Sequence, residues 1–204
     1  MTRAAEPIAL QLSDDVKARH AESVKRYPSL NLSDGEYIIS EVRRHAIGLI
    51  PIVAAAAFII VLILVGLLMY PTFQSSSSGT MPAFDTLIMP AILLIVLVAL
   101  GGYIAVSVYL GNKFFLTNES VIQEIQTSLL AHNEQTVSLI NIEDASYTQL
   151  GIFQMMFDYG SIRLSTEGDE TTYRFAYVSN PKKQIALLNN AVESFKNGRP
   201  VIND

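Results

Sequence analysis

Residues 46–70 read AIGLIPIVAAAAFIIVLILVGLLMY, and residues 84–110 read FDTLIMPAILLIVLVALGGYIAVSVYL. Neither run contains Lys, Arg or Glu, and the single charge, Asp85, lies at the outer edge of the second run. A helix needs about 20 residues to cross the hydrocarbon core of a bilayer, so each run is long enough. The linker, residues 71–83, is short and rich in Ser, Gly and Pro. The sequence therefore predicts a transmembrane helical hairpin.

Basic residues flank this hairpin on one side only. Arg43 and Arg44 precede the first run, Lys113 follows the second, and the linker contains no Lys or Arg. Because Lys and Arg accumulate on the cytoplasmic side of membrane helices, we expect both tails in the cytoplasm and the linker outside. The predicted location is a cell (plasma) membrane, with a multi-pass topology. Arg43, Arg44 and Lys113 are also candidate contacts for lipid headgroups.

Composition excludes several classes of site. The 204 residues include no cysteine, which excludes disulfides, thiolate metal sites and a cysteine nucleophile. The segment after the hairpin, residues 112–204, carries seven basic and eleven acidic side chains. A segment with a net negative charge is poorly suited to binding polyanions, so we expect no nucleic-acid partner.

Beyond Gly111, apolar and polar residues alternate along short runs, which is typical of half-buried antiparallel strands. One helix is then expected after Asn180, a candidate N-cap, with Pro181 at its first position and Gly198 at its end. Its apolar stripe would pack on the sheet. The stripe consists of Ile185, Leu188, Val192 and Phe195. We predict a domain at residues 112–197, followed by a tail at 198–204.

The segment before the hairpin, residues 1–45, is polar and contains one candidate helix. Ser13 can cap a helix over Asp14–Tyr27, with acidic residues in its first turn and basic residues in its last. Its apolar set is thin, which favours a marginal surface helix. The alternative is an amphipathic segment that lies on the membrane or on the following domain.

Four stretches together resemble one known family. They are residues 30–45 (LNLSDGEYIISEVRRH), residues 115–119 (FLTNE), residues 137–151 (VSLINIEDASYTQLG) and residues 156–166 (MFDYGSIRLST). In this order around a hairpin, they resemble the bacterial pleckstrin-homology-like (PH-like) membrane proteins. The resemblance implies a membrane protein of the α+β class, in which a PH-like antiparallel β-sandwich or barrel of six to seven strands is capped by one C-terminal helix. Ser120 and Thr127-Ser128 depart from the family pattern, where Arg and Gly are common, which argues against a basic groove in that hairpin.

No pattern in the chain indicates catalysis. His20, His45 and His132 are scattered over different elements, without histidine or carboxylate neighbours at metal-ligand spacing. The resemblance implies no activity either, because the family has no shared catalytic residues and a fold is not a function. We therefore predict no catalytic residue, no metal and no cofactor, and a protein that is not an enzyme.

The candidate interaction loop is LGIFQMMFDY at residues 150–159. The favoured interpretation is that it plugs an open end of the barrel, with methionines filling irregular space and Phe153 or Met156 at the surface. The alternative is an exposed apolar patch that docks on the bilayer, on the hairpin or on another copy. The candidate interaction residues are Ile152, Phe153, Met155, Met156 and Phe157.

The leading hypothesis is a membrane-anchored interaction module that binds a protein partner or forms a homo-oligomer at the inner face of the membrane. The alternative is a lipid headgroup sensor, for which Lys182 and Lys183 form the one small basic cluster. A small channel or transporter subunit is disfavoured because neither apolar run has an ionisable side chain in its interior.

Overall fold

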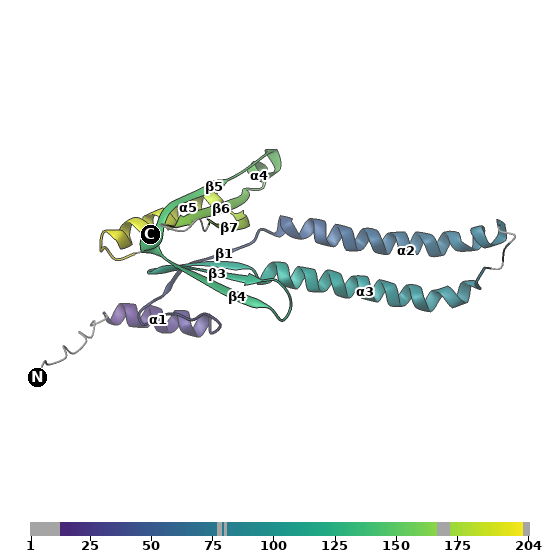
Figure 1. Cartoon of the computed structure of the whole chain (residues 1–204), viewed down its shortest axis with the longest axis horizontal. Helices are drawn as coiled ribbons and strands as arrows, with labels where there is room; N and C mark the ends of the chain where they lie inside the picture. The colour runs from purple at the N-terminus through teal and green to yellow at the C-terminus, as the bar shows by residue number, and fades with distance from the viewer. Residues whose placement is uncertain (1–12, 77–78, 80, 167–171, 202–204) are drawn as a thin grey trace, which may run out of the picture.

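Two long helices leave one end of a β-rich domain and run side by side (Figure 1). The computed structural model describes residues 13–76, 79, 81–166 and 172–201. The helices are α2 (Ile50–Ser76), which follows a short 3₁₀ turn at Ala46–Leu49, and α3 (Phe84–Gly111). Both are long and apolar enough to cross a membrane. No side chain of α2 is buried, so its apolar surface requires lipid or another apolar partner.

Seven antiparallel strands form two sheets over the described residues. The first sheet, in the order β1-β2-β3-β4, contains β1 (Ile38–Arg43), β2 (Lys113–Thr117), β3 (Ser120–Gln126) and β4 (His132–Ser138). The second, in the order β5-β6-β7, contains β5 (Ile142–Thr148), β6 (Tyr159–Thr166) and β7 (Thr172–Ser179). A 3₁₀ turn at Leu139–Asn141 joins them.

The helical hairpin is inserted between two neighbouring strands of one sheet. β1 precedes α2 and pairs with β2, which follows α3, so that Arg43 lies opposite Lys113. The expected domain at residues 112–197 therefore omitted its first strand, which the expected polar segment at residues 1–45 had included. Ile38 and Val42, which precede the first apolar run, belong to β1, and Tyr37 and Val42 are buried in the domain.

The junction of hairpin and domain is held by several hydrogen bonds. The Tyr109 hydroxyl of α3 donates to the His45 carbonyl at 2.7 Å, and the His45 N–H donates to the Tyr177 carbonyl of β7. The Asn112 amide donates to the carbonyl of Gln126 in β3 at 3.1 Å. These bonds join the two ends of the hairpin to each other, the first end to the second sheet and the last end to the first sheet, and so fix the domain against the helices.

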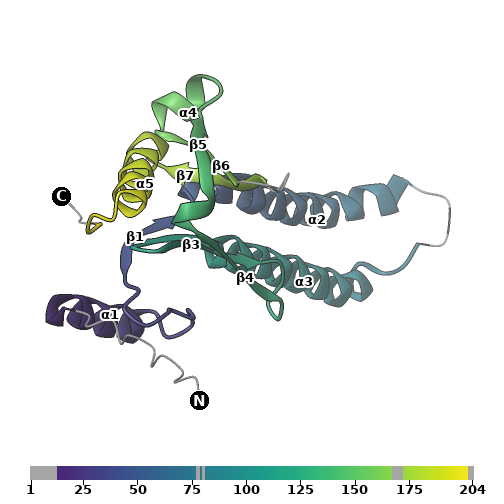
Figure 2. The same ribbon diagram turned by 60° about the vertical axis from the view of Figure 1, so that its left-hand side comes forward.

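The core lies between the two sheets and under α5 (Pro181–Lys196) (Figure 2). The predicted stripe is confirmed, since Ile185 and Leu188 are buried and Val192 and Phe195 pack against the core. Asn180 occupies the N-cap position, but its side chain makes no capping hydrogen bond, contrary to expectation. Its backbone is left-handed, with φ of 51°, a conformation that Asn tolerates better than most residues.

The segment before β1 packs on the outer face of the first sheet. Helix α1 (Asp14–Arg26) is capped by Ser13 as predicted, and the Ser23 hydroxyl accepts a hydrogen bond from the Ile38 N–H at 3.0 Å. Leu30 packs against Phe115 and Ile122 of the sheet. Of the interpretations open for this helix, the structure supports packing on the domain. The rest of the segment, residues 1–12, lies outside the described residues.

Glu36 is a buried carboxylate that fastens this segment to the β2–β3 turn. Its Oε1 atom accepts hydrogen bonds from the hydroxyls of Thr117 at 2.6 Å and Ser120 at 2.5 Å. Its Oε2 atom accepts one from the Ser33 N–H at 3.0 Å. A buried carboxylate is tolerated only when it is hydrogen-bonded, and these three bonds satisfy that condition.

Glu119, in the same turn, makes stability depend on pH. Burial and the nearby Glu36 carboxylate raise the pKa of Glu119 above its ordinary value of 4.5. The folded state thus binds the Glu119 proton more tightly than the unfolded state. This difference contributes to the free energy of unfolding below the ordinary pKa, and the contribution is lost as pH rises through the raised pKa. We expect the unfolding temperature of E119Q to rise relative to that of the wild type as pH increases from about 4 to about 7. A difference that does not change with pH would contradict this.

Candidate functional site

The loop between β5 and β6 carries an apolar surface that points away from the core. It contains the short helix α4 (Ile152–Met156). We define the α4 surface as six side chains that are 46% to 77% exposed. They are Leu150, Ile152, Phe153, Met155, Met156 and Phe157. The core is closed by α5 without them, which contradicts the favoured interpretation of this loop as a barrel plug.

Two glutamines hold the loop in shape while its apolar side chains face outward. The Gln149 amide lies within hydrogen-bonding distance of the Gln154 and Tyr159 carbonyls and of the Asp158 carboxylate. The Gln154 side-chain oxygen accepts from the Leu150 N–H at 2.6 Å. The exposure of the α4 surface is therefore built into an ordered loop.

The α4 surface lies at the end of the domain from which the hairpin leaves. In Figure 1, α4 and the tip of the β3–β4 turn reach the level along the long axis at which α2 begins and α3 ends. That turn exposes Leu129 and Leu130, the latter to 99%. Two apolar loops therefore flank the base of the hairpin on the side that would face a bilayer.

Three of the basic candidates also lie at this end. Arg43 and Lys113 end and begin the paired strands β1 and β2, next to the hairpin. Arg44 forms a bridge with Val178 near the end of β7, and α5, which starts with Lys182 and Lys183 in its first turn, follows directly. Topology thus places Arg43, Arg44 and Lys113 beside the hairpin, whereas Lys182 and Lys183 begin the helix that follows the strand bridged by Arg44.

Arg43 and Lys113 already have acidic partners. The Arg43 guanidinium donates to both Glu41 oxygens, at 2.7 and 3.1 Å. Burial raises the pKa of Glu41, but hydrogen bonds from Arg43 and Tyr27 outweigh it, so the pKa of Glu41 lies below its ordinary value. Lys113 lies 3.9 Å from the buried Glu124 carboxylate.

Arg44 differs from these cations because none of the described residues places a carboxylate within ion-pairing distance of it. Its guanidinium stacks over the Tyr109 ring at 5.3 Å and the Phe175 ring at 5.6 Å. Its Nε atom is buried and makes no hydrogen bond. Burial lowers the pKa of the Arg44 guanidinium. Arg44 also lines a groove of about 690 Å³ at the base of the hairpin.

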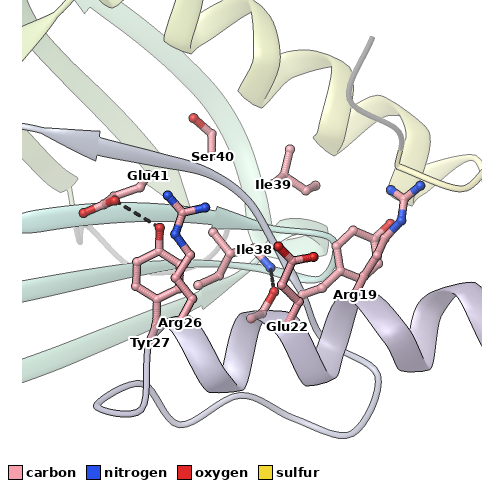
Figure 3. A pocket seen from close by; sticks show the side chains of 10 residues that line it. Arg19, Glu22, Arg26, Tyr27, Ile38, Ile39, Ser40 and Glu41 are labelled. Atoms are coloured by element: carbon pink, nitrogen blue, oxygen red, sulfur yellow. Dashed lines mark hydrogen bonds between the residues drawn. The ribbon is translucent and has the colours of Figure 1, made fainter.

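A second pocket, of about 440 Å³, lies between α1 and β1 (Figure 3). Arg19 and Arg26 line it, and each lies over a tyrosine ring of the same pocket. The Tyr27 hydroxyl donates to Glu41 at 3.0 Å across its mouth. The sequence did not predict this pocket, because it depends on α1 packing beside an edge strand. Its lining holds two arginines and two glutamates, so its charge indicates no class of ligand.

The histidines lie apart in the structure. His45 stacks on Tyr159 at the hairpin junction, His20 bonds the Glu36 carbonyl at 2.6 Å, and His132 lies 3.5 Å from Glu124. Among the described residues, no group of three or more His, Cys, Asp or Glu side chains is placed to hold a metal ion.

Comparison with known proteins gives one family match. The family described as "Bacterial PH domain" matches residues 37–192, a range that begins just before β1 and includes the hairpin. No curated protein matches the chain. Among solved structures, it is similar to a DUF1696 family protein with a pleckstrin-homology domain from Shewanella loihica PV-4. That similarity has 13% identity and a TM-score of 0.32, and covers 41% of this chain and 69% of the other.

Proposed function

Because this chain belongs to the bacterial PH domain family, we propose that it is a non-catalytic interaction module anchored at the inner face of a bacterial-type cell membrane. The apolar surfaces of α2 and α3 and the cations at their domain ends support the anchor. With two crossings, the segment before α2 and the segment after α3 lie on the same side, which the flanking cations indicate is the cytoplasm.

The observation that carries this proposal is that a hydrogen-bonded loop at the base of the hairpin holds the side chains of the α4 surface exposed. A monomeric soluble domain rarely exposes a contiguous apolar patch of this size without using it for binding. We infer that the α4 surface docks a protein partner or a second copy of the chain. Because this surface lies at membrane level, the partner itself must reach the membrane surface.

The test is chemical crosslinking in intact membranes followed by affinity capture. The wild type is compared with the double variant Phe153→Ser and Met156→Ser. Each change removes an apolar contact of about 1.5–3 kcal/mol, so captured partners or self-crosslinked species should fall roughly tenfold or more. The matched control, Leu129→Ser with Leu130→Ser, alters the neighbouring apolar loop and should leave capture intact. The same captured set from all three proteins would mean that the α4 surface contacts lipid and not protein.

Lipid headgroup recognition is the second candidate function. The observation that favours it is the position of Arg43, Arg44 and Lys113 beside the hairpin, with Lys182 and Lys183 in the first turn of α5. Acidic residues outnumber basic ones after the hairpin, so bulk attraction to an anionic surface is weak. Recognition would have to come from a specific cation, and Arg44 is the one whose environment fits.

A further inference from the structure

We propose that Arg44 and the groove beside it bind the phosphate group and upper acyl chain of an anionic phospholipid from the inner leaflet. This inference rests on the proposed membrane anchor, and it assigns to one residue the lipid recognition that is otherwise only a second candidate function.

The first argument is that Arg44 lacks a counter-ion. Within the described part of the chain, no ion pair or hydrogen bond reaches its guanidinium, whereas the adjacent Arg43 is bound by both oxygens of Glu41. The faces of Tyr109 and Phe175 offset part of the cost of burying this charge. A half-buried cation is otherwise costly unless it is paired and hydrogen-bonded. The environment is therefore suited to an anion that comes from outside the chain.

The second argument is the chemistry of the groove. One wall is apolar and comes from the hairpin, with Ile52 of α2 and with Ile104 and Val108 of α3. The opposite wall is polar and comes from the end of β3 and the turn after it, including Gln126 and Ser128. Arg44 is the only charged residue in the lining. A volume of about 690 Å³ with one cation, one apolar wall and one polar wall fits an amphiphile with an anionic head.

The third argument is depth. Arg44 lies two residues before the apolar stretch that starts at Ala46, and the groove reaches Asn112, the residue after α3 ends. In an anchored protein these positions lie at the boundary between hydrocarbon and headgroups, where Arg side chains reach phosphates. The apolar wall then continues directly into lipid, which favours a phospholipid over a soluble phosphate compound.

The experiment uses the full chain purified in a neutral detergent. Its thermal unfolding, followed by circular dichroism, is measured with added phosphatidylglycerol, phosphatidylcholine or sn-glycerol 3-phosphate. We expect phosphatidylglycerol to stabilise the wild type and the exposed-site control Arg199→Gln alike, and its apparent affinity to fall at least tenfold in Arg44→Gln. Phosphatidylcholine and glycerol phosphate should stabilise none of them. Equal stabilisation of Arg44→Gln and the wild type by phosphatidylglycerol would overturn the proposal, and so would an equal effect of glycerol phosphate, which would assign the groove to soluble phosphates.

A second variant keeps the test decisive if Arg44→Gln folds poorly. Ile104→Trp retains Arg44, places a larger side chain in the apolar wall, and introduces the only tryptophan of the chain. We expect weaker stabilisation by phosphatidylglycerol, and strong quenching of the fluorescence of this tryptophan by phosphatidylglycerol that carries brominated acyl chains. Unchanged stabilisation together with no quenching would exclude a lipid from the groove. Extraction of the wild type from membranes by alkaline carbonate would instead refute the proposed anchor, so the two failures are distinguishable.

Discussion

Phe175→Ala is expected to reduce the free energy of unfolding by about 3–5 kcal/mol, the usual cost of truncating a buried phenylalanine. Phe175 is 2% exposed, lies in β7 at the centre of the core, and packs against Phe114 of β2 with ring centroids 5.7 Å apart. It therefore joins the two sheets across the sandwich. Its ring also lies under the Arg44 guanidinium, so truncation removes part of the support for that cation.

The measurement is denaturant unfolding in detergent, followed by circular dichroism in the region of the β-sheet signal. Phe153→Ala is the matched control, because it makes the same chemical change at a side chain that is 68% exposed. We expect the control to change stability by no more than about 0.5 kcal/mol. Similar losses for the two variants would show that the sheets do not share the core described here.

Glu36→Ala is expected to cost about 2–4 kcal/mol, because hydrogen bonds to a buried carboxylate are stronger than neutral ones and their donors lose a partner. The lost partner is the acceptor for the Thr117 and Ser120 hydroxyls and the Ser33 N–H. The loss should also free α1 from the first sheet, which limited trypsin digestion would detect as faster cleavage after Lys25 and Arg26.

Glu143→Ala serves as the control for this prediction, since Glu143 is exposed on β5. It should leave both stability and cleavage nearly unchanged. Glu36→Gln, which keeps the side-chain size and one acceptor oxygen, is expected to fall between the two. If Glu36→Ala behaved like the control, the carboxylate would not be what fastens the N-terminal segment to the β2–β3 turn.

Local patterns predicted much of the fold. The resemblance to bacterial PH-like proteins is confirmed by the family match over residues 37–192. The two apolar helices, the strands after Gly111 and the helix after Pro181 follow from periodicity and end signals that lie within a few residues of each element. Membrane insertion, the orientation of the tails and the identity of any partner stay predictions.

Features that depend on distant contacts were missed. β1 is six residues long and adjoins an apolar run, so its strand character shows only in its pairing with β2. The side chains of the α4 surface were expected to plug the barrel because exposed apolar side chains are costly in water. That argument weakens for a domain that lies beside a membrane. Arg43 and Arg44 are neighbours of the same type. Arg43 pairs locally with Glu41, whereas Arg44, without an ion pair among the described residues, stacks on the distant rings of Tyr109 and Phe175.

The insertion of the hairpin between β1 and β2 has a consequence for how the chain folds during synthesis. Arg43 and Lys113 lie opposite each other but are 70 residues apart, so β1 leaves the ribosome long before its partner. Closing a flexible loop of that length carries an entropic cost, whereas two antiparallel helices return the chain to its starting point. Membrane insertion of the helices would thus precede and guide the first strand pairing. Under the proposed membrane anchoring, the order of translation would make the helical hairpin a template on which the domain is completed.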